Sequence, residues 1–283
     1  MLSADSQKGK AVLNQWESFL KNLNVWVGSF TQFSPQGEQI EDRPSRLTLE
    51  GLNDNQSARL TLQREGLQDL VLEFSTMSRS TLFFENGAFS QGTIQFAPGT
   101  EFGAEFGLIH QNRRLRLVQL FNNDGNLKSL TLIREHSEGS DKDERPPLTV
   151  EALLGEWEGE TTTIYTDLRN PVTSTTKMKL HLDSQGHLVQ NLSFGDHTIT
   201  STAKINDSIL EFDGNPSNAI QILMLPDGAS ATFPVKAQPR QPLFLETAWL
   251  IEPNWRQRMI RSYDDRGEWV SLTLVSERKV SNG

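Results

Sequence analysis

Residues 112–135 read NRRLRLVQLFNNDGNLKSLTLIRE, and residues 254–277 read NWRQRMIRSYDDRGEWVSLTLVSE. The two stretches align without a gap, with Ser271 lying 142 residues after Ser129. Identical residue types meet at Asn112, Arg114, Arg116, Gly125, Ser129, Leu130, Thr131, Leu132 and Glu135, opposite Asn254, Arg256, Arg258, Gly267, Ser271, Leu272, Thr273, Leu274 and Glu277. Because self-similarity at a fixed spacing marks a duplicated structural unit, the sequence predicts two copies of one fold.

The beginnings of the two copies also correspond. Trp26-Val27-Gly28 matches Trp157-Glu158-Gly159, 131 residues further on, so the second copy carries extra residues between its ends. Residues 136–147, HSEGSDKDERPP, are polar, charged and end in two prolines, as linkers often do. We therefore predict an N-terminal domain over residues 1–136, a linker over 137–147 and a C-terminal domain over 148–283.

Both copies have the sequence pattern of antiparallel β-structure. Apolar and polar residues alternate over 46–50, 58–62 and 176–182, as in half-buried strands. Turn signals such as Asp124-Gly125 and Arg266-Gly267 recur at short spacing. Many short strands favour an all-β barrel or sandwich, and no strand–helix alternation indicates a parallel α/β fold.

Helix is expected at two places, one before each set of strands. Residues 9–23 place their apolar side chains on one helical face, namely Val12, Trp16, Phe19, Leu20 and Leu23. A shorter turn from Thr149 to Leu154 occupies the same position before the second copy. Each helix is predicted to cap its barrel.

Composition excludes several function classes. The formal net charge of −9 argues against non-specific nucleic-acid binding, which needs a basic face. The chain has no cysteine, which excludes thiol nucleophiles and iron–sulfur clusters. It has no run of about 18 apolar residues and no signal-peptide pattern, so we expect a soluble cytoplasmic protein without a membrane span.

No catalytic or metal site is predicted. The histidines are His110, His136, His181, His187 and His197, and their spacing matches no zinc or facial-triad motif. Asp264-Asp265 is explained by the hairpin turn beside Gly267. The sequence also lacks the Gly-x-Ser-x-Gly and phosphate-binding Gly-rich patterns.

Gly155-Glu156-Trp157 has the G-x-W form that opens the first strand of lipocalin-like barrels, in which the tryptophan closes the barrel floor and an arginine from a late strand covers its ring. In the first copy, Asn24-Val25-Trp26 lacks the glycine. Trp26 and Trp157 are the expected floor residues.

Residues 246–258, ETAWLIEPNWRQR, resemble the E-x-x-W…P-N-x-R-x-R stretch of S-type phycobiliprotein lyases. Those lyases are lipocalin-fold proteins that carry linear tetrapyrroles, or bilins, to antenna apoproteins. The whole chain resembles a cyanobacterial and plastid family of double lipocalin-like (calycin) proteins of undefined function, related to these lyases. The resemblance implies an all-β fold of two tandem antiparallel barrels, each with a short capping helix.

The resemblance also implies roles for single residues. In the lyases the R-x-R pair lies inside the barrel and meets the chromophore propionates. Carried over, Arg256 and Arg258 would bind propionates, Trp249 would form part of the wall, and Glu246 would be the acidic partner near the pyrrole nitrogens. The first copy retains the pair as Arg114 and Arg116.

The ungapped alignment makes the first copy the poorer site. It places Ala104 opposite Glu246 and Gly107 opposite Trp249. Glu105 is one residue off, and we expect it to point to the other face of its strand. The remaining tryptophans of the second copy, Trp255 and Trp269, have no aromatic counterparts either. We therefore expect the specialised site in the C-terminal copy.

Residues i and i+2 of a strand share a face and lie about 7 Å apart, so two guanidinium groups there can each bind a carboxylate. Three interpretations remain open at this point. The pair could lie on the outer face, could point into the barrel, or could include one arginine that covers the floor tryptophan. Buried arginines are costly unless paired, so inward ones need a bound anion or Glu246 nearby.

The predicted function is that of a lipocalin-like binding protein for a small hydrophobic or amphipathic ligand, such as a linear tetrapyrrole. An eight-stranded barrel is wide enough for one such ligand. A lyase-like handover to a phycobiliprotein would rest on positioning, since no nucleophile is offered. The alternative is a non-enzymatic assembly or interaction protein of the photosynthetic apparatus. A pocket of a few hundred Å³ with inward arginines favours the first function, and a filled lumen favours the second.

Overall fold

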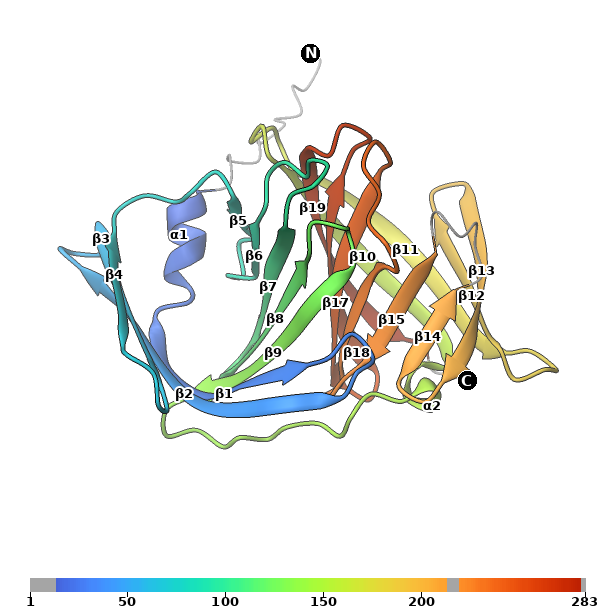
Figure 1. Cartoon of the computed structure of the whole chain (residues 1–283), viewed down its shortest axis with the longest axis horizontal. Helices are drawn as coiled ribbons and strands as arrows, with labels where there is room; N and C mark the ends of the chain where they lie inside the picture. The colour runs from blue at the N-terminus through green and yellow to red at the C-terminus, as the bar shows by residue number, and fades with distance from the viewer. Residues whose placement is uncertain (1–13, 213–218, 281–283) are drawn as a thin grey trace, which may run out of the picture.

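The computed structural model describes residues 14–212 and 219–280, and its regular secondary structure is almost entirely antiparallel β (Figure 1). The N-terminal copy contains α1 (Gln15–Leu20), β1 (Asn24–Phe33), β2 (Gln39–Leu52), β3 (Ser57–Arg64), β4 (Leu70–Phe74), β5 (Thr81–Phe83), β6 (Phe89–Gly92), β7 (Phe102–His110), β8 (Arg113–Phe121) and β9 (Leu127–Ser137). The C-terminal copy contains α2 (Val150–Leu153), β10 (Gly155–Tyr165), β11 (Val172–Leu182), β12 (Leu188–Phe194), β13 (His197–Asn206), β14 (Ile209–Phe212), β15 (Ile220–Met224), β16 (Ala229–Pro234), β17 (Leu243–Glu252), β18 (Trp255–Tyr263) and β19 (Trp269–Lys279). The predicted fold class, all-β with two tandem calycin-like units, is confirmed.

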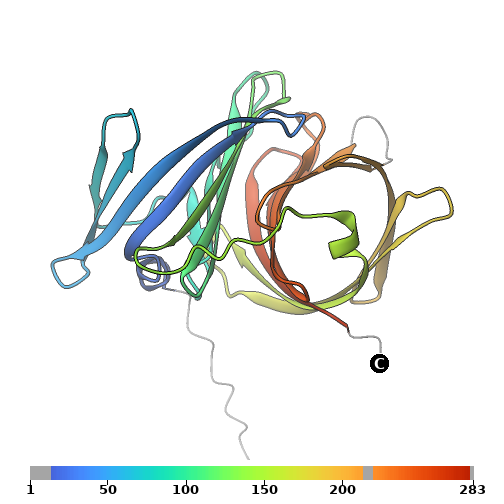
Figure 2. The ribbon, with the colours of Figure 1, turned by 90° about the horizontal axis from the view of Figure 1, so that it is seen from below.

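The two copies differ in how far their sheets close. Strands β10 to β19 form a closed barrel in which β10 pairs with β19, and this barrel appears as a ring in Figure 2. The N-terminal strands form a nine-stranded sheet whose two edges are β4 and β5, so this copy is a curled half-barrel. The expected eight-stranded barrel is therefore corrected in both copies, since one has ten strands and the other has nine and stays open.

Both short helices lie where the sequence predicts caps. Asn14 and Thr149 are the N-cap residues of α1 and α2, and each accepts backbone N–H groups through its side-chain oxygen. The helix predicted over residues 9–23 begins outside the described part, which excludes Val12. Phe19 is buried, and the other predicted apolar side chains pack around it, namely Trp16, Leu20 and Leu23. Neither described helix is long and apolar enough to span a membrane.

The two copies share a core where β7 and β8 meet β17 and β18. Phe106 and Leu117 from the first copy belong to the same buried cluster as Phe233 and Trp249 from the second. Arg261 is fully buried in this contact, and its Nη2 donates to the Thr93 carbonyl at 2.9 Å. Residues 138–149 then run from β9 to α2 (Figure 1). The domain limits at 136 and 148 stay a prediction, since the copies are packed together.

Candidate functional site

The repeated R-x-R segments lie on β8 and β18, and each places two arginines on the concave face of its sheet. Arg114, Arg116 and Arg256 are buried, and the Arg258 side chain is only 11% exposed. Arg256 and Arg258 line the lumen of the closed barrel, and the first pair lines a cavity in the half-barrel. The inward interpretation is therefore correct, and the outer-face alternative is wrong.

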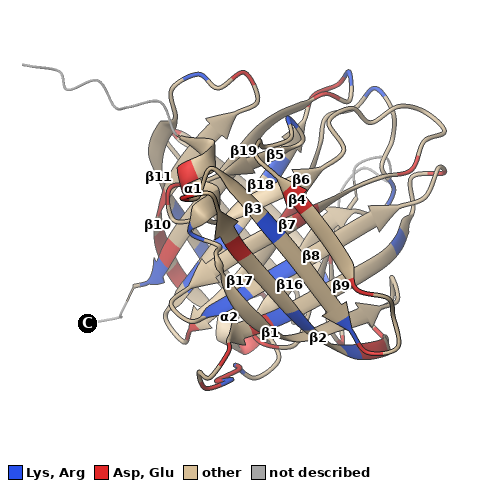
Figure 3. Cartoon of the chain, turned by 90° about the vertical axis from the view of Figure 1, so that its left-hand side faces the viewer, with Lys and Arg blue, Asp and Glu red and all other residues tan. Residues whose placement is uncertain are grey.

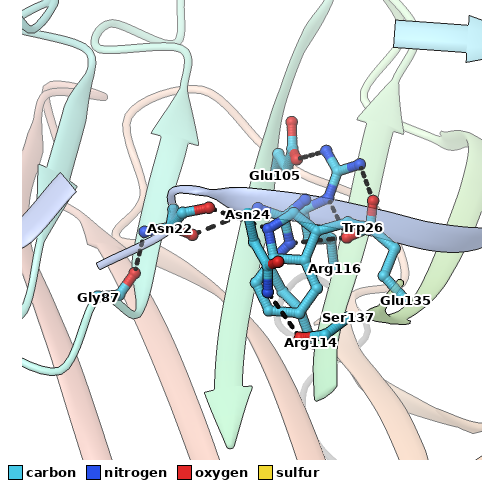
Figure 4. A network of polar contacts seen from close by, with 9 residues as sticks. All are labelled: Asn22, Asn24, Trp26, Gly87, Glu105, Arg114, Arg116, Glu135 and Ser137. Carbon is cyan, nitrogen blue, oxygen red and sulfur yellow. Dashed lines mark hydrogen bonds and ion pairs between the residues drawn. The ribbon is translucent and has the colours of Figure 1, made fainter. Parts of the chain in front are cut away.

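In the N-terminal copy, the pair is bound by two carboxylates (Figure 4). Glu135 on β9 accepts hydrogen bonds from Arg114 Nε at 2.7 Å and from Arg116 Nε and Nη2 at 3.1 and 2.8 Å. Glu105 on β7 accepts one from Arg116 Nη1 at 2.6 Å. Two positive and two negative groups thus form a neutral network.

The C-terminal copy repeats this arrangement with looser contacts. Arg256 Nε donates to Glu277 at 2.5 Å, as Arg114 does to Glu135. Arg258 Nε lies 3.2 Å from Glu277, and Arg258 Nη1 lies 3.5 Å from Glu246. Neither ion pair of Arg258 has hydrogen-bond geometry: its Nε and Glu277 Oε1 are both buried without a hydrogen-bond partner among the described residues.

The first arginine of each pair covers the floor tryptophan. Arg114 lies 4.5 Å from the ring centroid of Trp26, and Arg256 lies 4.6 Å from that of Trp157. The two indole N–H groups donate to backbone carbonyls just before each first strand, at 2.9 and 2.8 Å. The interpretation that one arginine covers the floor tryptophan is therefore correct for Arg114 and Arg256. Arg116 and Arg258 line the cavities.

The expectation that Glu105 points away from the arginines is wrong. Glu105 pairs with Val118 across β7 and β8, and Glu246 pairs with Ile260 across β17 and β18. Val118 and Ile260 are aligned in the sequence repeat, so the two glutamates occupy equivalent positions. The ungapped alignment is off by one because β17 has a bulge near its end, which adds a residue that β7 lacks. Both copies therefore have the acidic residue.

The two copies differ instead in how well the second arginine is bonded. Arg116 makes three hydrogen bonds to Glu105 and Glu135. Arg258 has only its two longer ion pairs, and its buried Nε has no well-aligned acceptor among the described residues, although a guanidinium has five N–H donors. Buried polar groups are normally hydrogen-bonded, so Arg258 has donors available for a ligand that enters the lumen.

The carboxylates of the two clusters have different pKa values. Burial alone would raise the pKa of Glu135, but Arg114 and Arg116 outweigh it and bring the pKa to about 2. The pKa of Glu277 is lowered in the same way, by its two arginines against burial. Burial raises the pKa of Glu246, and Arg258, which lies 3.5 Å away and lowers it, does not offset this effect. Glu246 is thus the carboxylate most easily neutralised.

The lumen of the closed barrel contains a cavity of about 460 Å³. Glu246 and Arg258 line both this cavity and a small pocket of about 40 Å³ that extends toward α2, so they lie between the open space and the floor. The walls are mostly apolar and include Leu192, Ile199, Phe212, Ile220, Ile222, Phe244 and Ile260. This shape suits a molecule with a hydrophobic body and one carboxylate end.

Trp249 does not line the lumen, and its predicted role in the wall is wrong. Along β17, Glu246, Ala248 and Leu250 face the lumen, so Trp249 faces the opposite side. Its ring is buried against the N-terminal copy, 5.1 Å from the guanidinium of Arg113. The other two late tryptophans also lie outside the lumen: Trp255 contacts His110, and Trp269 stacks under Arg261.

Sequence reasoning missed the role of two residues. Glu135 and Glu277 form the centre of each cluster, yet no role was predicted for them. The sequence contained a signal for them, because the two glutamates align in the repeat. Each lies near the end of the strand that follows the R-x-R strand. Two buried arginines need a carboxylate beside them to offset their charge, and the repeat keeps one in both copies.

Two family models match the chain. Residues 12–140 match the N-terminal domain of unknown function DUF3598, and residues 144–280 match the C-terminal domain of "Biogenesis factor required for ATP synthase 1". A crystal structure of a DUF3598-family protein of unknown function from Nostoc punctiforme is 57% identical to this chain. It covers 95% of this chain and 100% of its own, with a TM-score of 0.93.

Two other solved structures are much less similar to this chain. An S-type phycobiliprotein lyase from Guillardia theta is 11% identical, covers 47% of this chain and 92% of its own, and has a TM-score of 0.37. A putative outer membrane protein from Bacteroides fragilis is 12% identical, covers 94% of this chain and all of its own, and has a TM-score of 0.24. Such scores carry no argument about function. No curated protein matches the chain.

Proposed function

The chain belongs to the DUF3598 family, and we propose that it binds a small amphipathic carboxylate, such as a linear tetrapyrrole, in the lumen of its closed C-terminal barrel. The ligand carboxylate would contact Arg258, and its hydrophobic body would lie along the apolar walls toward the mouth. The protein would act as a carrier, and any handover to a phycobiliprotein would depend on positioning alone.

The observation that carries this proposal is the incomplete bonding of Arg258. This guanidinium lies beside a cavity of about 460 Å³, is held by ion pairs of 3.2 and 3.5 Å, and has no well-aligned acceptor for its Nε among the described residues. Arg116, at the equivalent place, is fully occupied by two carboxylates. A carboxylate in the lumen could form the bidentate contact that Arg258 lacks, and hydrogen bonds to charged groups are among the stronger ones.

The remaining polar groups fit one charged end of a ligand better than two. Arg256 is engaged by the Trp157 ring, by Glu277 and by the sulfur of Met178 at 3.0 Å. We therefore assign Arg256 to the floor and Arg258 to the ligand. A cavity of a few hundred Å³ with an inward arginine also favours a ligand carrier over a barrel with a filled lumen.

The test mixes purified protein with phycocyanobilin and, separately, with a fluorescent long-chain fatty acid. Binding should give a red-shifted, sharpened bilin absorption band or a rise in fatty-acid fluorescence. Arg258→Gln should weaken binding by about tenfold or more, the effect of losing one charge-assisted contact of roughly 1.5–3 kcal/mol. Arg278→Gln is the matched control, because Arg278 lies on the same barrel with its side chain 64% exposed.

Two results would overturn the proposal. If neither probe changes its spectrum at high protein concentration, the lumen does not bind this class of ligand. If both probes bind but Arg258→Gln binds them as tightly as the Arg278→Gln control, then Arg258 is not the anchor and the argument from its free donors is wrong.

A second candidate function is an assembly role, which the family model over residues 144–280 favours by its description. In this case the protein would bind a subunit of the ATP synthase through its outer surface, with no ligand in the lumen. Native mass spectrometry of the purified protein with isolated ATP synthase subunits would detect the complex. An interaction that survives Arg258→Gln unchanged would separate this role from the carrier role.

A further inference from the structure

Among the described residues, the N-terminal copy has no counterpart of one strand that the C-terminal copy has. In the closed barrel, β14 pairs with β13 on one side and β15 on the other. In the half-barrel, residues 75–80 join β4 directly to β5, and these two strands do not pair. Residues 207–219 separate β13 from β15 and contain β14, and this longer connection accounts for most of the extra length of the second copy.

The pairing registers show that β4 corresponds to β13. From Trp26, successive strand partners lead through Leu47 and Leu62 to Leu70 on β4. From Trp157, the same steps lead through Met178 and Leu192 to Ile199 on β13. The place next to β4 is therefore the place that β14 fills beside β13.

Because no described strand fills the place next to β4, apolar residues of β4 are exposed to solvent. Leu70, Val71 and Leu72 are 42%, 54% and 48% exposed, on a strand whose outer edge pairs with no other described strand. Unprotected apolar edge strands readily pair with other chains, and native proteins usually cover them. In the closed barrel, β14 does so, and its Leu210 is completely buried.

On the other side of the gap between β4 and β5, the edge of β5 is hydrogen-bonded by α1. Gln15 on α1 accepts from the Phe83 N–H at 2.7 Å and donates to the Phe83 carbonyl at 3.1 Å, so its amide bonds the edge of β5 as a strand would. The ring of Phe19 lies 5.3 Å from that of Phe74 on β4 and 5.7 Å from that of Phe83 on β5. The β5 edge is therefore occupied, and the edge of β4 is the one that the described residues leave open.

A cavity of about 360 Å³ lies beside this edge. Leu60, Leu72, Phe74, Met77 and Phe83 are among its lining residues, and they come from β3, β4, β5 and the connection between the last two. Apolar side chains that project inward from a strand laid against β4 would enter this space. The charged groups at its far side are already paired with each other, so an uncharged side chain suits it best.

We propose that the open edge of β4 binds an extended segment of another polypeptide, antiparallel to β4, with apolar side chains entering the adjacent cavity. The chemistry of the segment is given by the chain's own equivalent strand, Ile209-Leu210-Glu211-Phe212, which pairs antiparallel with β13. Acidic and basic residues are interspersed on the side of the molecule that carries β3 and β4, which favours an apolar rather than a strongly charged segment (Figure 3).

A foreign segment is favoured over a second copy of this chain. A symmetric pair of copies would meet through the five residues of β4, Leu70–Phe74. Such a contact is far smaller than the roughly 1,200 Å² that stable interfaces bury. Main-chain pairing plus side chains inserted in pockets is, by contrast, how sheet edges bind extended peptides. This site is independent of the ligand proposed for the barrel lumen.

The test uses the full chain and a fluorescent peptide with the mainly apolar sequence of residues 208–212, SILEF. Anisotropy should detect binding, and hydrogen exchange should show protection of the β4 amides on peptide addition. A peptide with proline in place of its central leucine should not bind, because proline cannot donate to the ladder. Leu72→Lys should weaken binding by about tenfold or more, since one buried leucine contact is lost.

The matched control is Leu168→Lys, because Leu168 is also an exposed leucine, 54% exposed, but lies in a turn of the C-terminal copy. No binding, or protection that spares β4, overturns the proposal. Protection of β4 that rises with protein concentration in the absence of peptide also overturns it, in favour of a second copy. Binding that appears only after deletion of residues 1–13 would mean that the chain's own N-terminal segment competes for the edge, and would likewise contradict a foreign occupant.

Discussion

Replacing Arg116 with glutamine should destabilise the protein more than replacing Arg258, although the two are equivalent positions of the repeat. Arg116→Gln removes three hydrogen bonds and leaves Glu105 without its arginine. It also leaves Glu135, whose side chain is completely buried, with only Arg114. Breaking a buried ion pair by removing one partner costs about 3–5 kcal/mol, and the retained Arg114 contact places this case near 3 kcal/mol.

Arg258→Gln removes only the two longer ion pairs, at 3.2 and 3.5 Å, in which Arg258 Nε has no well-aligned acceptor. Glu277 keeps the 2.5 Å contact with Arg256, and Glu246 can take up a proton because burial already raises its pKa. The cost should then be about 1 kcal/mol, within the range of an ordinary lost polar contact. The two substitutions should therefore differ by about 2 kcal/mol.

Thermal unfolding followed by circular dichroism can resolve this difference. A change of 1 kcal/mol shifts Tm by about 2–4 °C in chains of about 150–250 residues, and longer chains lie at the lower end, so we expect a drop of roughly 6 °C for Arg116→Gln and about 2 °C for Arg258→Gln. Arg278→Gln, on the exposed surface, should shift Tm by less than either. Equal drops for the two cluster variants would refute the reasoning, because Arg258 would then be as firmly bonded as Arg116.

Three further substitutions test the two carboxylate clusters and the edge of β5. The pKa of Glu135 is about 2 in the folded protein and near 4.5 in the unfolded chain. The ionised Glu135 carboxylate therefore stabilises the fold fully above pH 4.5, and this stabilisation is lost as pH falls from 4.5 toward 2. Glu135→Gln should remove this part of the acid sensitivity, as measured by the pH dependence of urea unfolding. Glu246→Gln should strengthen binding of an anionic ligand at neutral pH, measured by titration, because it removes a lumen-facing carboxylate that is paired with Arg258; weaker binding would show that Glu246 contacts the ligand directly. Gln15→Ala should speed hydrogen exchange at Phe83 and cost about 1 kcal/mol, since two hydrogen bonds to the β5 edge are lost, and unchanged exchange would show that Gln15 does not hold that edge.

The sequence was sufficient to predict the strands of the repeated hairpin and the shared face of the two arginines. The repeat at 112–135 and 254–277 covers one whole hairpin of each copy, and a hairpin keeps its register when no residue is inserted. Alternation along β8 and β18 then sends residues i and i+2 to the same face. The lipocalin-like resemblance supplied the direction of that face, which periodicity alone left open.

Other features depended on pairing that the sequence does not reveal. A single bulged residue in β17 moved the apparent partner of Glu246 from Glu105 to Ala104, because side chains change face at every residue of a strand. Trp249 was misplaced for a related reason, since the packing of one copy on the other buries the outer face of β17 as well as the inner one. Burial on both faces removes the alternation that sequence patterns rely on.

The extra length of the second copy was visible as the change in spacing from 131 to 142 residues, but its consequence was not. One added strand, β14, decides whether the sheet closes, because a closed barrel needs every strand to have two neighbours. The same duplication therefore gives one copy a lumen and the other an open edge.

The charges of the closed copy limit what its lumen can bind. Arg256, Arg258, Glu246 and Glu277 sum to zero when all are ionised, so a carboxylate that enters would add an uncompensated negative charge to a buried site. Protonation of Glu246 restores neutrality, and burial raises the pKa of that group. Binding of an anionic ligand should then take up a proton and weaken as pH rises. Calorimetric titration in buffers of different ionisation enthalpy would measure that proton, and an affinity independent of pH would show that the ligand carries no charge into the lumen.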